Sequence, residues 1–197
     1  MKRLSLYLFL LLFTLQTPSQ ADDIRDFQIE GMSIGDSLLD HFSEEEINDY
    51  SRPEWFKNDK FTPVSGLTSN KFETYEVLQI AFKTKDKKKS IYSIEGIIFY
   101  ENMIECENKL DEITNEFSNI FKETKSKGKN KFDHLGDKTG ESKVIDSSFE
   151  LLSGDIIMIG CIDWSEKLTK KNGWKDQLRI TIRLKEYSDF LRNKAYE

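Results

Sequence analysis

The sequence predicts an α+β protein built on a mainly antiparallel, five-stranded sheet with helices packed on it. Three observations lead to this fold class. Segments of alternating apolar residues follow one another across short polar turns, as in β-hairpins. One segment, 103–122, repeats its apolar residues every three or four positions, as an amphipathic helix does. The remaining patterned segments are short, so the predicted order is α-α-β-β-α-β-β-β-α within one domain.

The N-terminus has the layout of a secretory signal peptide. Two basic residues precede an apolar run over residues 4–15. This run is about a dozen residues long, whereas a membrane-spanning helix needs roughly 20. Small residues, Ser19 and Ala21, stand at the −3 and −1 positions of a possible cut. We therefore predict a signal peptide over 1–21 and a single α+β domain over 22–197, with an uncleaved N-terminal anchor as the alternative.

Export places the mature chain in the periplasm or outside the cell. No later segment is apolar and long enough to cross a bilayer, so we expect no transmembrane segment after cleavage. The full chain has 29 basic and 35 acidic residues and a net charge of −6. Loss of Lys2 and Arg3 with the signal peptide makes the mature charge −8. This acidity argues against nucleic acid as a partner.

Two cysteines, Cys106 and Cys161, remain after cleavage. Thiols usually pair in an oxidising compartment, so we expect a disulfide between them, with two free thiols as the alternative. Cys106 lies in the first turn of the predicted helix and Cys161 well inside a predicted strand. Pairing therefore requires the strand to begin below the helix. Because the two cysteines do not form a C-x-x-C motif, a thioredoxin-like redox role has little support.

Two short helices are predicted near the start of the mature chain. Each opens with a serine that is followed three residues later by an acid, at Ser33 and at Ser43. The first helix is predicted to end near Phe42 and the second before Pro53. The segment after this proline is predicted to be irregular, apart from a short strand near 61–64.

Strands dominate the rest of the chain. Residues 73–83 and 90–100 form a predicted hairpin across a lysine-rich turn. After the long helix and a polar loop at 124–142, we expect three further strands and a final short helix from about residue 186; the strands are 143–152, 156–164 and 175–184. Strand 156–164 is apolar on both sides, so we predict that it is central and covered on both faces.

Lysines gather in three segments, the turn at 83–89, the loop at 122–143 and the turn at 165–176. If the elements alternate in direction, all three emerge at one end of the sheet with a net charge of +9, and the rest of the mature chain is −17. Such an end attracts an anionic envelope component or an acidic protein. The alternative is that the lysines only keep turns and strand edges soluble. The candidate contact residues are Lys87, Lys88, Lys89, Lys127, Lys129 and Lys131.

The leading expectation is therefore a non-enzymatic, exported binding or envelope-associated protein that uses this lysine-rich end. No recognisable pair of nucleophile and base is present, which favours binding over catalysis without deciding between them. Neither His41 nor His134 has a second ligand at metal-binding spacing, so we expect no metal and no cofactor. Trp164 and Trp174 flank the last turn, where we expect them to pack on each other rather than on a sugar.

Two alternatives remain open. The first is a hydrolase that uses carboxylates on the sheet, because glycosidase chemistry needs two acids that converge. The second is an inhibitor or subunit that acts through a sheet edge. The plausible acids are Glu95, Asp146, Glu150 and Asp163, and the polar strand positions that would line a cleft with them are Ser93, Ser148, Arg179, Thr181 and Arg183.

Two stretches carry a resemblance to other proteins. Residues 27–47 read Phe-Gln-Ile-Glu-Gly-Met-Ser-Ile-Gly-Asp-Ser-Leu-Leu-Asp-His-Phe-Ser-Glu-Glu-Glu-Ile, and residues 91–100 read Ile-Tyr-Ser-Ile-Glu-Gly-Ile-Ile-Phe-Tyr. With 162–165 and 174–182, they resemble a group of short exported proteins of marine alphaproteobacteria whose function is uncharacterised. The resemblance implies that both cysteines are paired, and it implies no activity.

A second resemblance is confined to Gly31-Met32-Ser33, which precedes a predicted short helix. It is similar to the opening of the small lipoprotein of the β-barrel assembly machinery. The present chain lacks the lipid-bearing cysteine of that protein, so the resemblance does not extend to a lipid anchor.

Overall fold

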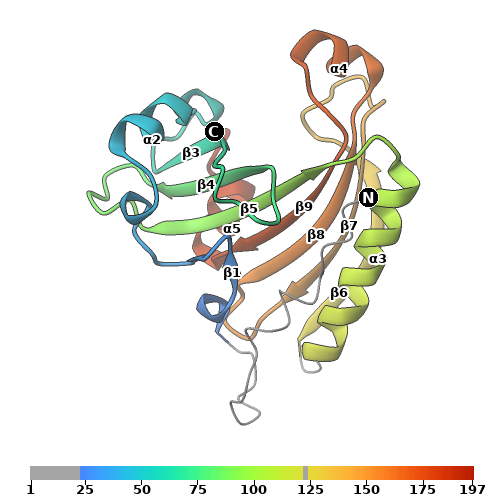
Figure 1. Cartoon of the computed structure of the whole chain (residues 1–197), viewed down its shortest axis with the longest axis horizontal. Coiled ribbons are helices and arrows are strands. Elements are labelled where there is room, and N and C mark those ends of the chain that lie inside the picture. Colours follow the sequence, from blue (N-terminus) through green and yellow to red (C-terminus); the bar gives the residue numbers. More distant parts are fainter. Residues whose placement is uncertain (1–22, 122–123) are drawn as a thin grey trace.

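The main sheet has seven antiparallel strands in the order β3-β4-β5-β9-β8-β7-β6 (Figure 1). The computed structural model describes residues 23–121 and 124–197, so the predicted signal peptide lies outside the described residues. A two-stranded ribbon, β1 and β2, precedes the sheet. The strands are β1 (Gln28–Ile29), β2 (Met32–Ser33), β3 (Phe61–Leu67), β4 (Val77–Lys83), β5 (Ile91–Phe99), β6 (Lys125–Asp133), β7 (Lys143–Glu150), β8 (Ile156–Asp163) and β9 (Gln177–Arg183).

The α+β class and the antiparallel sheet are confirmed, but the predicted count of five strands is wrong. Strand β3 extends to Leu67, beyond the short strand predicted near 61–64. Strand β6 occupies the segment that we predicted to be a polar loop. Every residue of β6 is exposed, so no apolar alternation marks it in the sequence. Its main chain pairs with β7, and that pairing does not depend on side-chain hydrophobicity.

Within the described residues, four α-helices accompany the sheet, α2 (Glu44–Tyr50), α3 (Met103–Ile120), α4 (Glu166–Asn172) and α5 (Lys185–Asn193). The predicted capping box at Ser43 is confirmed, because its side chain accepts from the N–H of Glu46 while the Glu46 carboxylate accepts from the N–H of Ser43. The helix predicted from Ser33 is wrong. Asp36 does accept a hydrogen bond from the N–H of Ser33, but the chain there forms β2 and a short 3-10 turn. Helix α4 lies in a segment predicted to be a turn.

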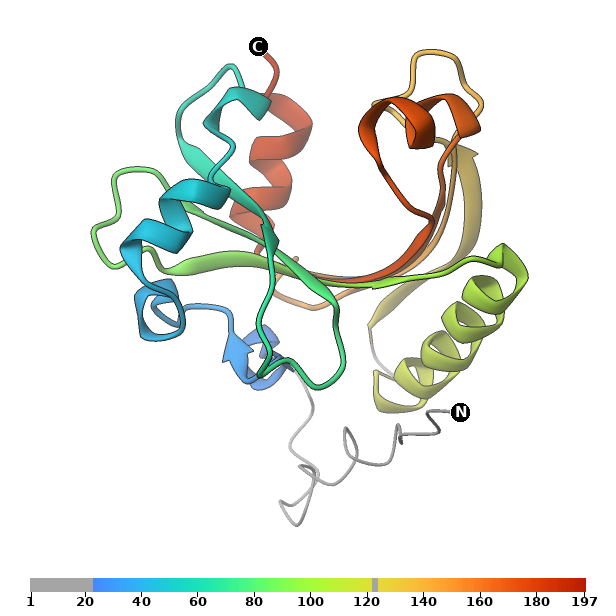
Figure 2. The same ribbon diagram turned by 45° about the horizontal axis from the view of Figure 1, so that its top comes forward.

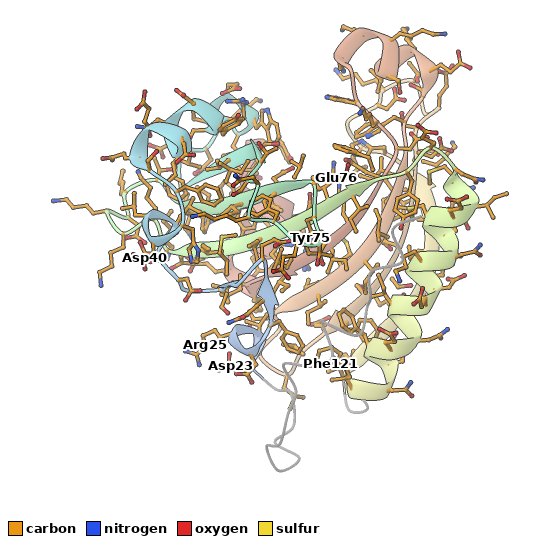
Figure 3. The ribbon with its side chains drawn as sticks, in the orientation of Figure 1. Asp23, Arg25, Asp40, Tyr75, Glu76 and Phe121 are labelled. Atoms are coloured by element: carbon orange, nitrogen blue, oxygen red, sulfur yellow. A yellow bond between two sulfur atoms is a disulfide. The ribbon has the colours of Figure 1, made fainter. Side chains whose placement is uncertain are left out.

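One face of the sheet is apolar and packed. Helix α3 lies against β7, β8 and β9 on this face, and the segment around β1 and β2 packs into the same core. Figure 3 shows Phe121 at the end of α3 beside this segment, where its ring lies 5.2 Å from that of Phe27. We call this the covered face; its strand residues are Ile94, Gly96, Ile98, Leu178, Ile180, Ile182, Ile157, Ile159, Cys161, Ile145, Ser147 and Phe149.

The disulfide between Cys106 and Cys161 is present and fastens the covered face. It joins the first turn of α3 to β8, with the two Cα atoms 6.1 Å apart. Both cysteines are fully buried. The strand does not begin below the helix; β8 runs beside α3 in the opposite direction, so Cys161 near the end of the strand reaches the first turn of the helix (Figure 1).

The opposite face is concave and only half covered (Figure 2). Helix α5 packs over β3, β4 and β5 through Tyr187 and Phe190, whereas no helix lies over β7, β8 and β9 on this side. Strand 156–164 is interior to the sheet, as predicted, but its second face is only partly covered: Ile162 and Trp164 are buried there, whereas Ile156 and Met158 are half-buried. We call this the open face; its residues are Ser93, Glu95, Ile97, Phe99, Gln177, Arg179, Thr181, Arg183, Ile156, Met158, Gly160, Ile162, Val144, Asp146, Ser148 and Glu150.

Candidate functional site

The turn between β4 and β5 concentrates lysines from two parts of the chain. Lys60, from the loop before β3, joins the lysines of the turn beside an open depression lined by Asp59, Lys60, Lys83 and Lys85. One acid on α5 serves two of these lysines, because the carboxylate of Glu186 lies 2.9 Å from Lys60 Nζ and 3.0 Å from Lys83 Nζ. We name this surface the turn cluster; it comprises Lys60, Lys83, Lys85, Lys87, Lys88 and Lys89.

Hydrogen bonds hold the turn in one shape. The Asp86 carboxylate accepts from the N–H of Ser90 at 2.9 Å and of Lys88 at 3.0 Å. The bond from Ser90 is the main cause that holds the pKa of Asp86 below its usual range. The hydroxyl of Ser37 donates to the Lys88 carbonyl at 2.8 Å, which ties the turn to the N-terminal segment. Three lysine side chains of the turn are thus presented on a fixed backbone and exposed, namely Lys85, Lys87 and Lys88.

The other three candidate lysines lie on β6, the far edge strand of the sheet. Lys129 Nζ is 3.0 Å from Asp111 and 3.3 Å from Glu107, both on α3. Lys127 faces the open side, where its charge lowers the pKa of Asp146 against the larger, opposite effect of burial. Lys131 pairs across the strands with Ile145. Acids from α3 and β7 therefore accompany the β6 lysines, and they form no separate basic surface.

The assumption that all lysine-rich segments emerge at one end is wrong. Strand register places the β4–β5 turn beside Arg183, at the end of β9. The turn between β6 and β7, and the segment that contains α4, lie beside Gln177 at the opposite end. The cause is β6 itself, since one additional strand reverses the direction of every element that follows. The structure therefore does not bring Lys87, Lys88 and Lys89 together with Lys127, Lys129 and Lys131.

The open face carries an ordered polar network that spans β5 and β9. Arg179 Nη1 lies 2.9 Å from the Glu95 carboxylate, and the two side chains are only 21% and 12% exposed. The hydroxyl of Thr181 donates to the other carboxylate oxygen at 2.8 Å. With its amide oxygen turned toward Arg179, Gln177 accepts from the guanidinium Nε at 2.9 Å. The charge of Arg179 is thus neutralised inside the network.

The four predicted acids do not converge. Asp163 lies on the covered side of β8, since it pairs with Lys143 and stands an odd number of positions from Gly160. Glu95 and Asp146 share the open face, but three strand spacings, about 14 Å, separate their strands. Glycosidases need their two carboxyl groups roughly 5 to 9.5 Å apart. Burial raises the pKa of Asp146, while Glu95 is committed to its ion pair.

Aromatic rings lie at one end of the open face. Trp164 stands between two other rings, with ring centroids 4.3 Å from His134 and 4.4 Å from Trp174. The predicted packing of the two tryptophans is confirmed. His134 accepts a hydrogen bond at Nδ1 from the N–H of Gly136. Burial, together with the charge of Arg179, holds the pKa of this histidine below its usual range.

The described residues contain no group of three or more His, Cys, Asp or Glu side chains arranged to hold a metal ion. None of the helices within residues 23–121 and 124–197 is long and apolar enough to span a membrane. Comparison with protein-family models, with curated proteins and with solved structures finds no match for this chain. What the fold defines is an α+β protein with a disulfide-fastened helix on one sheet face and a half-open polar face on the other.

Sequence reasoning identified several open-face residues as strand positions. It did not predict that Gly160, which has no side chain, lies between two of them, Arg179 and Asp146. The alternation of β5 and β9 was sufficient to place Glu95, Arg179 and Thr181 on one face. It did not give the register between strands that sets Gly160 between Arg179 and Asp146. A glycine inside an otherwise apolar strand was the available signal, because glycine weakens a strand unless something approaches it closely.

Proposed function

We propose that the protein is an exported, non-enzymatic binding protein that attaches to an anionic envelope surface through the turn cluster. The observation that carries this proposal is the set of Lys85, Lys87 and Lys88, exposed on a backbone that Asp86 and Ser37 hold in place. No carboxylate of the described residues forms an ion pair with these three lysines. Because the backbone of the turn is already ordered, contact with an anionic surface orders only the lysine side chains.

Export is supported by the disulfide, because such bonds persist chiefly in oxidising compartments. Binding rather than catalysis is supported by the separation of the sheet carboxylates, which leaves no pair of acids at a reactive spacing. Lys129 is excluded from the proposed contact, since Glu107 and Asp111 already neutralise it, and Lys127 and Lys131 lie on the far edge strand of the sheet. The proposal thus concerns one end of the molecule and half of the lysines that the sequence indicated.

Vesicle sedimentation tests the proposal with two matched triple variants. Lys85→Gln/Lys87→Gln/Lys88→Gln removes three charges from the turn cluster, and Lys125→Gln/Lys127→Gln/Lys131→Gln removes three from β6. Each lysine near an anionic surface contributes about 1 kcal/mol, so the turn variant should lose most of its binding to vesicles that contain phosphatidylglycerol. The β6 variant should bind as the wild type does, and phosphatidylcholine vesicles should bind neither protein.

Equal losses in both triple variants would show that overall charge, and not the turn cluster, drives attachment. Unchanged binding in the turn variant would contradict the proposal directly. A salt titration adds a second reading, because contacts between exposed charges weaken steeply as ionic strength rises.

A further inference from the structure

Gly160 stands at the centre of the open face, and the fold gives no reason for a glycine there. It pairs with Arg179 on one side and with Asp146 on the other. A Cβ atom at this position would lie 3.5 Å from Asp146 Cβ and from the Ile145 carbonyl oxygen, which are ordinary contacts, and no other described atom is within 4 Å. Its backbone does not have a positive φ. Glycine inside a strand is less stable than alanine, so a side chain has been left out where one fits.

Gly96, a second glycine inside a strand, is required by packing and so serves as a comparison for Gly160. Gly96 lies on the covered face, and a Cβ atom there would overlap the ring of Tyr75. Figure 3 shows this tyrosine lying over β5. Packing therefore accounts for Gly96, whereas no packing accounts for Gly160. An omitted side chain on an uncovered face leaves room for something outside the chain to approach the strand.

The groups around Gly160 offer both donors and acceptors. Arg179 is neutralised by Glu95 at 2.9 Å, which leaves its guanidinium as a source of N–H donors. On the other side, the half-buried Asp146 carboxylate accepts no hydrogen bond and joins no ion pair among the described residues. Along β8, two apolar side chains flank the glycine on the same face: Met158 is half-buried, and Ile162 is buried, with 5% of its surface exposed. The surface of β8 at Gly160, which we call the floor, is therefore a small apolar area between the donor Arg179 and the acceptor Asp146.

We propose that the open face binds a neutral saccharide over Gly160, between Arg179 and Asp146. Sugar hydroxyls both donate and accept, so one ring satisfies the free carboxylate of Asp146 and the remaining N–H groups of Arg179. The C–H face of the ring matches the half-buried side chain of Met158. An anionic ligand fits less well, because it would meet the unpaired Asp146 carboxylate and would bring an uncompensated charge beside an ion pair that is already neutral. This site is separate from the turn cluster and does not rest on the function proposed above.

The probes are maltotriose, cellotriose and the trimer of N-acetylglucosamine, with glutamate and inorganic phosphate as charged comparators. Binding to the protein purified after export is measured by saturation-transfer NMR and by calorimetry. We expect at least one trisaccharide to bind at millimolar concentration, and neither charged comparator to compete with it.

Gly160→Ala fills the floor with a methyl group that the fold accommodates, so it should weaken saccharide binding about tenfold, which is a change of about 1.4 kcal/mol. The matched control is Gly128→Ala on the exposed edge strand β6, where nothing lies within 4 Å of the new atom, and it should leave binding unchanged. Asp146→Asn keeps the shape of the side chain but replaces one acceptor oxygen with a donor, and should also weaken binding.

Three results would overturn the proposal. They are the absence of binding by all three saccharides, full binding by Gly160→Ala, and binding of glutamate or phosphate in place of a saccharide. Circular dichroism of each variant tests whether the protein is still folded. Loss of binding by Gly160→Ala supports the proposal only if the spectrum of the variant matches that of the wild type. Vesicle attachment should not change in any of these variants, so failure of the saccharide site and failure of the turn cluster are separate results.

Discussion

The two faces of the same sheet differ in polarity, packing and the helices that cover them. The covered face is apolar, closed by α3 and cross-linked by Cys106 and Cys161. The open face carries a largely buried ion pair, Arg179 with Glu95, and has no layer over three of its strands. Residues that alternate along one strand thus enter environments that differ in hydration and packing. The comparison indicates that the covered face holds the packed core, whereas the open face holds polar side chains without a covering helix over three of its strands.

The largest expected effect is on the covered face. Cys106→Ala/Cys161→Ala removes a cross-link that spans a sequence separation of 55 residues. Chain-entropy arguments give about 4 kcal/mol for a loop of this length, so urea should unfold the variant at a much lower concentration. Wild-type protein in reductant is the control and should behave similarly. An unchanged midpoint in both samples would mean that α3 is held by packing alone.

Gly96→Ala comes next. The new methyl group overlaps Tyr75, which is itself buried in the core, so the ring and its neighbours must move. Overpacking of this kind costs about 1 to 3 kcal/mol. Thermal unfolding should show a lower midpoint, and Gly96→Ala/Tyr75→Leu should recover part of the loss. A single variant as stable as wild type would show that the covered face is less tightly packed than described.

Gly160→Ala should have the opposite sign. The methyl group meets only ordinary contacts at 3.5 Å, and alanine restricts the unfolded chain more than glycine does. We expect the variant to be more stable by roughly 0.5 to 1 kcal/mol, measured by urea unfolding. If it proves as destabilising as Gly96→Ala, the two faces do not differ in the way proposed and the glycine is a packing requirement.

The smallest effect depends on pH. Burial raises the pKa of Asp146 above its ordinary value of 3.8, so the folded state binds this proton more readily than the unfolded state does. The stability that comes from protonation is fully present below pH 3.8 and is lost as the pH rises through the raised pKa. Asp146→Asn stays neutral, so it should be more stable than wild type at pH 7. The difference should vanish in acid; a constant difference across pH would point to a cause other than ionisation.

Local patterns determined much of this protein. The capping box at Ser43, the period of α3 and the alternation of β4, β5, β7, β8 and β9 were all readable, because each depends on residues close together in the chain. Alternation also placed Glu95, Arg179 and Thr181 on one face. The two cysteines indicated their own pairing, since the sequence contains no other cysteine.

Only the tertiary structure decided where these pieces meet. Strand β6 carries lysine, serine, glycine and asparagine, and it exists because β7 offers its main chain to pair with. That one strand reversed the chain direction and so separated Lys87, Lys88 and Lys89 from Lys127, Lys129 and Lys131. Strand register then placed Gly160 between Arg179 and Asp146. Side-chain periodicity reports which face a residue occupies, whereas direction and register depend on hydrogen bonds between segments that are distant in the sequence.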